Sequence, residues 1–366
     1  MSLSIGIVGL PNVGKSTLFN AMLKSELAEA ANFAFTTIDP NIGIVDVPDD
    51  RLEHLKEVEN SKQIVNATVR FVDIAGLIEG AHKGEGLGNK FLSHIREVDA
   101  IAMVVRIFKN DDVMHVSSNP SPRNDIETII TELILSDTDT LNKRLSAIQK
   151  DVRSGDKLAT KKTVAYQKVL ETFEKSRPAI EASLSEEEAD LLKEANFLTL
   201  KPFLYVFNVS EENATSDPQE IIERFDLEDL VKTEEVAVIC AKTESELNNL
   251  MESDRQEYLS DLGLEEPGLN RLIRSAYTTL GLISFFTAGE MEARAWEIKK
   301  GSKAPQAAGA IHGDFEHKFI KAEVVSYQDF ITLGGWKGSK EAGKVRLEGK
   351  DYVVNEADVI YFHHGK

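Results

Sequence analysis

Short apolar runs alternate with segments of helical spacing in the first half of the chain. Residues 4–8 form one apolar run, and residues 17–23 then place apolar side chains at helical intervals. Other apolar runs end near residues 73, 105 and 207. This alternation of short strands with helices predicts an α/β fold.

The pattern changes between residues 125 and 200, where apolar residues recur at intervals of three and four, the period of a helix. The sequence RSGDK at residues 153–157 interrupts the first helical stretch, and a second one follows through residues 163–176. We predict two long antiparallel helices that form an arm inserted in the first domain.

Charge is uneven along this arm. Eight basic residues gather near the join of the two helices: Lys143, Arg144, Lys150, Arg153, Lys157, Lys161, Lys162 and Lys168. Such a patch indicates either an RNA-facing surface or an ordinary solvated helix face, and the sequence leaves both open. The acidic stretch at residues 183–195 predicts that charge is segregated along the arm.

Beyond residue 281, short β-rich runs alternate with glycine turns up to the end of the chain. This pattern predicts a small mixed sheet. His312 and His317 lie in this part, but neither a cysteine nor a third ligand accompanies them at metal-binding spacing. We interpret both histidines as structural.

The composition narrows the class of protein. The chain has 366 residues, a net charge of -19 and a hydrophobic content of 42%, which predicts a globular protein of two or three domains. No apolar run approaches the roughly 20 residues that span a bilayer, and residues 1–9 carry no export signal. A single cysteine suits a reducing compartment. We therefore expect a cytoplasmic protein with neither a membrane partner nor general affinity for DNA.

The sequence GLPNVGKST at residues 9–17 is the candidate phosphate-binding loop. Gly9, four further residues, Gly14, Lys15 and Ser16 stand between a predicted strand and a predicted helix, as this motif requires. Its glycines let backbone N–H groups wrap a polyphosphate. Lys15 is expected to reach the β- and γ-phosphates, and the Ser16 hydroxyl to ligate Mg²⁺. The candidate nucleotide-binding residues of this loop are Asn12, Val13, Gly14, Lys15, Ser16 and Thr17.

A second motif strengthens the prediction of a nucleotide site. In ATVRFVDIAG, Asp73 ends an apolar strand and Gly76 follows shortly after it. An acidic residue at such a strand end holds the metal through water, and a glycine N–H there contacts a γ-phosphate. Asp73 is therefore a candidate metal ligand, and Gly76 a candidate catalytic residue.

Four stretches carry a resemblance to a known family. Residues 32–43 (NFAFTTIDPNIG) and 73–101 resemble the switch regions of Obg-type NTPases. Residues 207–214 (FNVSEENA) and 309–330 narrow the match to the YchF-type Obg-like ATPases. The resemblance implies that Thr37, rather than Thr36, completes the Mg²⁺ shell.

The resemblance also implies the domain organisation. It predicts a Ras-like P-loop NTPase domain at residues 1–280, interrupted by the antiparallel helical arm at 125–200. Residues 281–366 would form an α+β TGS domain, which is a ubiquitin-like β-grasp module common in proteins that act around translation. Ribosomes or ribosomal RNA are the partners that the family implies, bound through the arm and the TGS domain.

The base-reading motif departs from that of GTP-specific proteins. They carry Asn-Lys-x-Asp, in which the Asp accepts two hydrogen bonds from guanine, whereas this chain reads Asn208-Val209-Ser210-Glu211. Loss of a group that hydrogen-bonds the base removes discrimination of about 10⁴-fold. The resemblance implies that Asn208 and Val209 face the base and that ATP is preferred over GTP. Whether Glu211 contacts the base or points to solvent stays open.

A second base-contacting loop is predicted at residues 240–242. Ala241 and Lys242 match the Ser-Ala-Lys loop of related NTPases, and Cys240 takes the place of the serine. A thiol beside a nucleotide suggests a redox-sensor hypothesis, but free cysteines are among the most buried residues. The sequence favours an inert packing role.

The usual means of placing the attacking water is absent from the sequence. Leu77 stands where Ras-like enzymes have a glutamine. The resemblance favours His115 as its replacement, with His82 a weaker candidate. A K⁺ ion coordinated by Asn12 is a further hypothesis. We predict slow turnover, near the roughly 10⁻³ s⁻¹ of unassisted switches.

These expectations describe a Mg²⁺-dependent, ATP-hydrolysing switch that prefers ATP to GTP and associates with ribosomes. Lys15, Gly76 and His115 are its candidate catalytic residues, and Ser16, Thr37 and Asp73 its candidate metal ligands. Two alternatives remain: an Obg-type GTPase, and an RNA- or ribosome-binding adaptor in which the nucleotide is a structural ligand.

Overall fold

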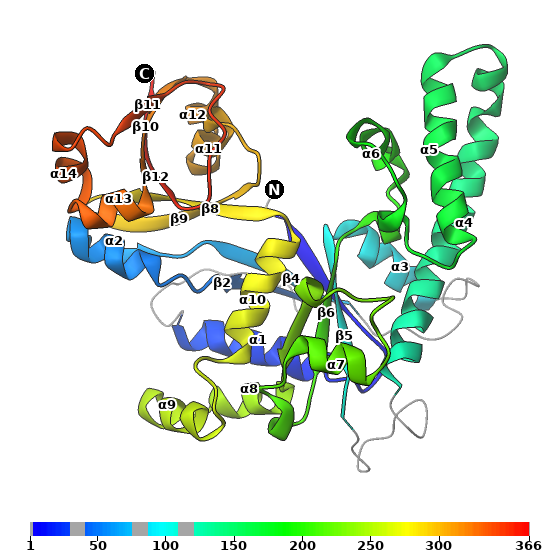
Figure 1. The fold of residues 1–366 in the computed structure, drawn as a ribbon, viewed down its shortest axis with the longest axis horizontal. Coiled ribbons are helices and arrows are strands. Elements are labelled where there is room, and N and C mark those ends of the chain that lie inside the picture. The colour runs from blue at the N-terminus through cyan, green and yellow to red at the C-terminus, as the bar shows by residue number, and fades with distance from the viewer. Residues whose placement is uncertain (1–2, 30–40, 75–86, 109–120, 366) are drawn as a thin grey trace. The chain divides into compact units, whose positions relative to one another are not determined.

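The computed structural model describes residues 3–29, 41–74, 87–108 and 121–365 (Figure 1). Contacts between residues divide the chain into two compact units. The N-terminal unit comprises Met1–Gly43 and Arg70–Ser275, and the C-terminal unit comprises Ile44–Val69 and Ala276–Lys366. Residues 44–69, predicted from the sequence to belong to the NTPase domain, therefore pack with the end of the chain.

A six-stranded sheet forms the core of the N-terminal unit, in the order β2-β4-β1-β5-β6-β7. Its strands are β1 (Ser4–Val8), β2 (Ile42–Asp46), β4 (Thr68–Asp73), β5 (Ala100–Arg106), β6 (Phe203–Asn208) and β7 (Val236–Ile239). The pairings from β4 through β7 are parallel. Every residue of β1, β5 and β6 is buried, as in parallel sheets covered by helices on both faces. The predicted α/β fold is confirmed.

Helices connect these strands. They are α1 (Lys15–Glu29), α3 (Leu87–Glu97), α7 (Pro218–Arg224), α8 (Ala241–Leu247), α9 (Glu252–Asp261) and α10 (Gly268–Thr279). Short 3₁₀ turns follow β6 at Glu211–Asn213 and precede β7 at Thr233–Glu235. Among the described residues, no helix is both long enough and apolar enough to cross a bilayer.

The inserted arm is a hairpin of two helices, α4 (Pro122–Arg153) and α5 (Lys157–Phe173), which lie side by side in Figure 1. The predicted break at RSGDK is confirmed, and Asp156 caps α5 by accepting a hydrogen bond from the Ala159 N–H (2.9 Å). The return to β6 is made by α6 (Glu186–Leu192) and 3₁₀ turns at Ala179–Glu181, Lys193–Ala195 and Leu198–Leu200.

A buried carboxylate fixes the base of the arm. Asp137 of α4 is fully buried and accepts hydrogen bonds from the backbone N–H groups of Leu198 (2.9 Å) and Thr199 (2.8 Å). The Thr199 hydroxyl donates a third bond to it (2.7 Å). Burial raises the pKa of Asp137, while these three donors oppose that shift.

The charges of the arm are not segregated in space, contrary to the sequence prediction. Lysines of α5 pair with glutamates of the acidic stretch: Lys161 with Glu187 (2.6 Å), Lys162 with Glu194 (3.0 Å) and Lys168 with Glu188 (2.7 Å). The hairpin folds the acidic segment back along α5, so residues distant in sequence neutralise one another. Of the eight basic residues near the join of the two helices, all of which the structure describes, four make neither an ion pair nor a side-chain hydrogen bond: Lys143, Lys150, Arg153 and Lys157.

The C-terminal unit contains a mixed six-stranded sheet in the order β11-β10-β12-β8-β9-β3. Its strands are β3 (Gln63–Val65), β8 (Leu282–Ala288), β9 (Glu292–Lys299), β10 (Phe319–Ser326), β11 (Arg346–Glu348) and β12 (Asp358–His364). Its helices are α2 (Arg51–Glu59), α11 (Ala304–Ile311), α12 (Gly313–His317), α13 (Tyr327–Thr332) and α14 (Gly335–Glu341). The β12–β8 and β3–β9 pairs are parallel and the others antiparallel, which confirms the predicted mixed sheet.

Both faces of this second sheet are covered. Phe285 belongs to a core with Ala307 and Ala308 of α11, whereas the adjacent Phe286 contacts the ring of Tyr327 and the guanidinium of Arg51. Both phenylalanines are fully buried. Leu52 and Leu55 of α2 are also buried and supply apolar surface to this unit. Because α2 belongs to residues 44–69, the C-terminal sheet has a helix that a contiguous domain of residues 281–366 would lack.

Candidate nucleotide-binding site

The predicted site residues gather at the carboxyl ends of the parallel strands. Asp73 at the end of β4 is in register with Ile7 of β1, which directly precedes the phosphate loop. Asn208 at the end of β6 is in register with Arg106 of β5 and Ile239 of β7. Ligands of open α/β sheets bind outside this edge.

The phosphate loop is tightly constrained by its neighbours. Gly14 has φ = +103°, and a Cβ added there would lie 2.3 Å from Nδ2 of Asn208, so only glycine fits. Asn12 adopts a left-handed conformation (φ = 63°), which asparagine tolerates better than most residues. Val13 is buried and anchors the loop in the core. The loop then continues directly into α1.

Lys15 is buried in this loop, with only 8% of its surface exposed. Its Nζ donates hydrogen bonds to the backbone carbonyls of Gly9 (2.9 Å) and Leu10 (2.7 Å). Burial lowers the pKa of Lys15 to about 8, and the charge of Asp73 partly opposes this shift. Two neutral carbonyls, its hydrogen-bond partners among the described residues, compensate a buried ammonium poorly, and a polyphosphate would supply negative charge.

The described metal-ligand candidates have the chemistry that Mg²⁺ requires. The side chains of Ser16 and Thr17 are exposed in the first turn of α1. Burial raises the pKa of the half-buried Asp73, and the nearby Lys15 opposes this effect. A carboxylate and a hydroxyl supply oxygen ligands, which Mg²⁺ prefers. Ser16 and Asp73 therefore fit a magnesium site.

Asn208 holds the phosphate loop in place through two side-chain hydrogen bonds. Its Nδ2 donates to the carbonyl of Val13 (2.8 Å), and its Oδ1 accepts from the N–H of Ala241 (3.0 Å). The side chain is buried, with 5% of its surface exposed. Val209 is buried as well, and its N–H donates to the carbonyl of Ile239 (2.9 Å). The carboxamide of Asn208 thus joins the phosphate loop to the start of α8.

The remaining base-loop candidates surround this brace. Ala241 is buried, and Lys242 is exposed and lies 3.7 Å from a carboxylate oxygen of Glu246. The other oxygen of Glu246 accepts a hydrogen bond from the Tyr258 hydroxyl (3.0 Å). Desolvation, the hydrogen bond to Glu246 and the charge of Glu211 raise the pKa of Tyr258 to about 12. Cys240 is buried directly before α8, which agrees with the packing role favoured by the sequence.

Several predicted residues lie outside the described part of the chain. They are the switch threonine Thr37 with Thr36, the candidate catalytic residues Gly76 and His115, and also Leu77 and His82. Among the described candidates, Asn208 is hydrogen-bonded to Val13 and Ala241, and Lys15 interacts electrostatically with Asp73. Lys242 follows Ala241 in the chain, and its side chain is paired with Glu246.

One arginine at this edge was not singled out from the sequence. Arg106 closes β5 and is almost completely buried. Its Nε donates to the carbonyl of Phe108 (3.2 Å), and its guanidinium lies 4.8 Å from the centre of the Phe108 ring. An arginine at the end of an otherwise apolar strand, AIAMVVR, is the signal that marks this position.

A parallel α/β sheet, a glycine-rich loop that enters a helix and a buried loop lysine define the class: this is a P-loop nucleotide-binding protein. Family models agree with this assignment. A model described as "50S ribosome-binding GTPase" matches residues 4–150, and the YchF-GTPase_C model, described as "Protein of unknown function", matches residues 282–365.

The chain belongs to the YchF family. It is 52% identical over 364 residues to the "Ribosome-binding ATPase YchF" of Bacillus subtilis (strain 168), with 99% of each chain covered. The protein of the same name from Escherichia coli O157:H7 is 49% identical, also over 99% of each chain. The solved structure of the Schizosaccharomyces pombe YchF GTPase superimposes with a TM-score of 0.87 at 36% identity and covers 99% of this chain and 98% of that one.

Replacing Asn208 tests whether its carboxamide braces the loop or reads the base. Asn208→Ala leaves the buried carbonyl of Val13 and the N–H of Ala241 without their partner, which costs about 1–3 kcal/mol for each unsatisfied group. We expect weaker binding of ATP and GTP by a similar factor, measured by calorimetry. Asn249→Ala, at an exposed position in the same unit, is the matched control. Selective loss of ATP binding would instead identify a base-reading role.

The lowered pKa of Lys15 makes nucleotide affinity sensitive to pH. In the free protein the amine loses its proton as the pH rises through about 8, whereas bound phosphates favour the charged form. Binding above that pH must therefore include proton uptake, and ATP affinity should fall by up to roughly tenfold per pH unit between about 8 and 10. Titrations at constant ionic strength measure this slope. Lys15→Arg, which stays protonated, should flatten it, and a pH-independent affinity of the unaltered protein would contradict the assignment.

Proposed function

We propose that this protein is a Mg²⁺-dependent ATPase that acts as a slow molecular switch on ribosomes. The observation that carries the proposal is the buried ammonium of Lys15, which donates hydrogen bonds to two backbone carbonyls of a loop that enters a helix. Relatives named "Ribosome-binding ATPase YchF", similar over 99% of the chain, supply the activity and the partner. A cytoplasmic location follows from that partner.

The residues of the site have separate roles in this proposal. Lys15 binds the β- and γ-phosphates and exchanges its carbonyl partners for phosphate oxygens. Ser16 and Asp73 would hold Mg²⁺, which neutralises the charge of the phosphates when it is bound. Asn208 keeps the loop in place through Val13 and Ala241. Thr37 would complete the metal shell, and Gly76 would contact the γ-phosphate, in line with the family resemblance.

ATP is the proposed nucleotide because the guanine-reading aspartate is absent. Glu211 stands at its position in a 3₁₀ turn, where it interacts electrostatically with Tyr258. We assign the base to the loops that carry Val209, Ala241 and Lys242. The GTPase alternative is supported by two names: the S. pombe structure and the N-terminal family model are both described as GTPases.

Slow hydrolysis belongs to this proposal because a glutamine is absent after the Asp-x-x-Gly motif. His115 would orient the attacking water, and a K⁺ ion at Asn12 would neutralise charge in place of an arginine finger. A slow intrinsic rate suits a switch whose bound state is read by a partner.

The tip of the arm is the proposed contact with ribosomal RNA. Lys150, Arg153 and Lys157 are exposed there, and neither they nor Lys143, nearer the middle of α4, form an ion pair with the acidic segment. Phosphate backbones bind such unpaired cations with release of counterions. The TGS domain would add a second contact. An adaptor that holds its nucleotide only as a structural ligand is the second candidate function.

Calorimetric titration with ATP and GTP in Mg²⁺ tests the nucleotide assignment. We expect ATP to bind more tightly than GTP by at least about tenfold, because the longer Glu211 replaces the aspartate that normally reads guanine. Lys15→Ala, which removes the ammonium, should abolish measurable binding of both nucleotides. A tighter constant for GTP would establish the GTPase alternative.

Cosedimentation with ribosomes tests the arm tip. Replacing Lys150, Arg153 and Lys157 by glutamate should weaken binding by at least about tenfold and reduce its dependence on salt. The matched control replaces Lys161, Lys162 and Lys168 by alanine, because glutamates already neutralise these lysines. Equal loss in both variants would contradict an RNA contact at the tip.

The same assay with Lys15→Ala separates the switch from the adaptor. Ribosome binding that is unaltered in this variant, with and without ATP, would favour the adaptor.

A further inference from the structure

Strands β2 and β4 form a two-stranded ribbon that carries the chain between the two units. The N–H of Asp73, at the end of β4, donates to the carbonyl of Asn41, just before β2 (2.9 Å). At the other end, the N–H of Val47 donates to the carbonyl of Ala67 (2.8 Å). The start of each strand thus pairs with the end of the other, so the strands run antiparallel.

One end of this ribbon belongs to the candidate metal site. Asp73 is the last residue of β4, and Asn41 lies four positions after Thr37 in the sequence. Asp73, one of the three proposed Mg²⁺ ligands, therefore lies at this end of the ribbon. A shift of one strand against the other would move Asp73 relative to the phosphate loop.

The other end is held in the C-terminal unit by backbone contacts. Residues 63–65 of β3 pair in parallel with β9. The Ser61 hydroxyl donates to the carbonyl of Gly289 (2.7 Å), and the Lys62 N–H donates to that of Glu290 (3.2 Å). At the end of α2, Glu59 accepts a hydrogen bond from the N–H of Trp336 (2.9 Å).

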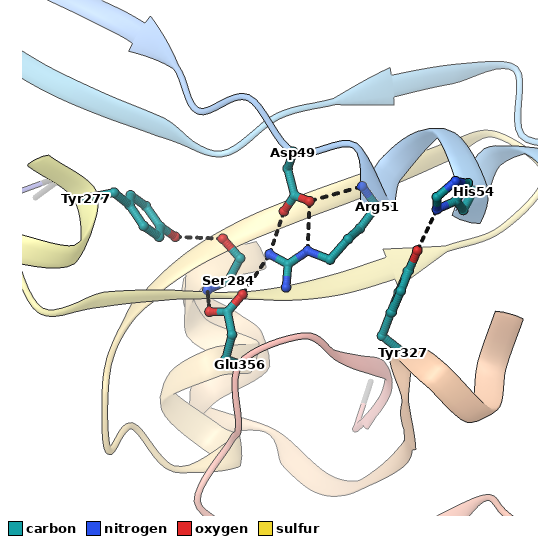
Figure 2. Close-up of polar contacts among 7 residues, drawn as sticks. All are labelled: Asp49, Arg51, His54, Tyr277, Ser284, Tyr327 and Glu356. Carbon is teal, nitrogen blue, oxygen red and sulfur yellow. Dashed lines mark hydrogen bonds and ion pairs between the residues drawn. The ribbon is translucent and has the colours of Figure 1, made fainter. Parts of the chain in front are cut away.

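Arg51 lies in the turn of the ribbon, residues 47–51, which follow β2. Figure 2 shows that its side chain connects this turn with Glu356, near the C-terminus. Its Nε and Nη2 each donate to one oxygen of Asp49 (2.7 Å for both), which forms a bidentate pair. Nη2 also lies 2.7 Å from Glu356. The other oxygen of Glu356 accepts from the N–H of Ser284 (2.8 Å), whose hydroxyl bonds to Tyr277 (2.8 Å).

The chemistry of this cluster makes it a firm attachment. The Arg51 guanidinium lies 4.9 Å from the centre of the buried Phe286 ring and is two-thirds buried. Bidentate arginine–carboxylate pairs are stronger and more directional than single ion pairs, and partial burial reduces their screening by salt. Asp49 and Arg51 come from residues 44–69, whereas Glu356, Ser284 and Phe286 come from the last part of the chain.

We propose that Arg51 is a positioning residue that couples the Mg²⁺–ATP site, at one end of the β2–β4 ribbon, to the C-terminal unit at the other. The proposal rests on the proposed ATPase function. Arg51 holds the turn of the ribbon, and the ribbon sets the position of Asp73. Because coupling free energies are reciprocal, a partner that binds the C-terminal unit changes the affinity for Mg²⁺–ATP by the same factor.

The chain provides its own reporter for this coupling. It has two tryptophans, Trp296 and Trp336, and both belong to the C-terminal unit. Tryptophan fluorescence therefore follows the unfolding of that unit alone, whereas ATP binds in the other. A ligand stabilises a unit that does not bind it only if the two units are energetically coupled.

The experiment measures urea unfolding of the full chain by tryptophan fluorescence, with and without saturating Mg²⁺–ATP. We expect Mg²⁺–ATP to raise the midpoint in the unaltered protein, and this increase to fall to less than about half in Arg51→Gln. ATP affinity without Mg²⁺, measured by calorimetry, should stay within about twofold in that variant, since the phosphate loop is untouched. A merely structural role would lower both midpoints and leave their difference unchanged.

Two further variants control the comparison. Arg346→Gln removes ion pairs with Glu348 and Asp358 in the same unit, remote in sequence from residues 44–69, and should keep the full increase. Arg51→Lys keeps the charge without the bidentate fork and should give an intermediate increase, which also serves if Arg51→Gln does not fold.

Two results would overturn the inference: a full increase in both Arg51 variants, or no increase in the unaltered protein while calorimetry shows that ATP binds. Absence of ATP binding in calorimetry would instead show that the proposed function is wrong.

Discussion

The buried ammonium of Lys15 is the group on which the nucleotide-binding unit depends. A lysine in this position loses hydration, and two backbone carbonyls replace it only in part, so its pKa falls. The loop must nevertheless keep its shape around the amine. The carboxamide of Asn208 does this by joining Val13 to Ala241, and Gly14 allows it to approach. The charge of Lys15 is incompletely compensated, and the loop around it is held in a fixed shape. Both properties favour the binding of a polyphosphate.

Much of this arrangement is predictable from the sequence because it depends on local patterns. The strand at Ser4–Val8, the break in the arm after Arg153 and the mixed C-terminal sheet all follow from periodicity and turn residues. The phosphate loop follows from spacing alone. These features are encoded by residues close to one another in the chain.

Features that depend on distant residues were not predictable in the same way. Asn208 was expected beside the base, and its two hydrogen bonds to the loop and to α8 appear only once three strands are aligned. From the sequence, Arg106 is an ordinary residue at the end of a strand, and only the structure shows that it contacts the Phe108 ring. The pairing of Lys161, Lys162 and Lys168 with the acidic segment likewise needs the hairpin to fold back. Hydrophobic periodicity carries no information about such partners.

The assignment of residues 44–69 is the largest difference, and its reason is physical. The stretch follows one strand of the first sheet and precedes another, so continuity places it with them. Its helix α2, however, buries Leu52 and Leu55 with the C-terminal residues, and Arg51 reaches Glu356. Apolar burial and a shared ion pair outweigh closeness in sequence.

The split composition of the C-terminal unit has a consequence for synthesis. Its first segment, Ile44–Val69, leaves the ribosome about two hundred residues before the second, which begins at Ala276. During that interval Leu52 and Leu55 have no apolar partner from the C-terminal strands and are open to association with other chains. A nascent chain that stalls before Ala276 therefore exposes the apolar side chains of α2, and these are buried only when translation is complete.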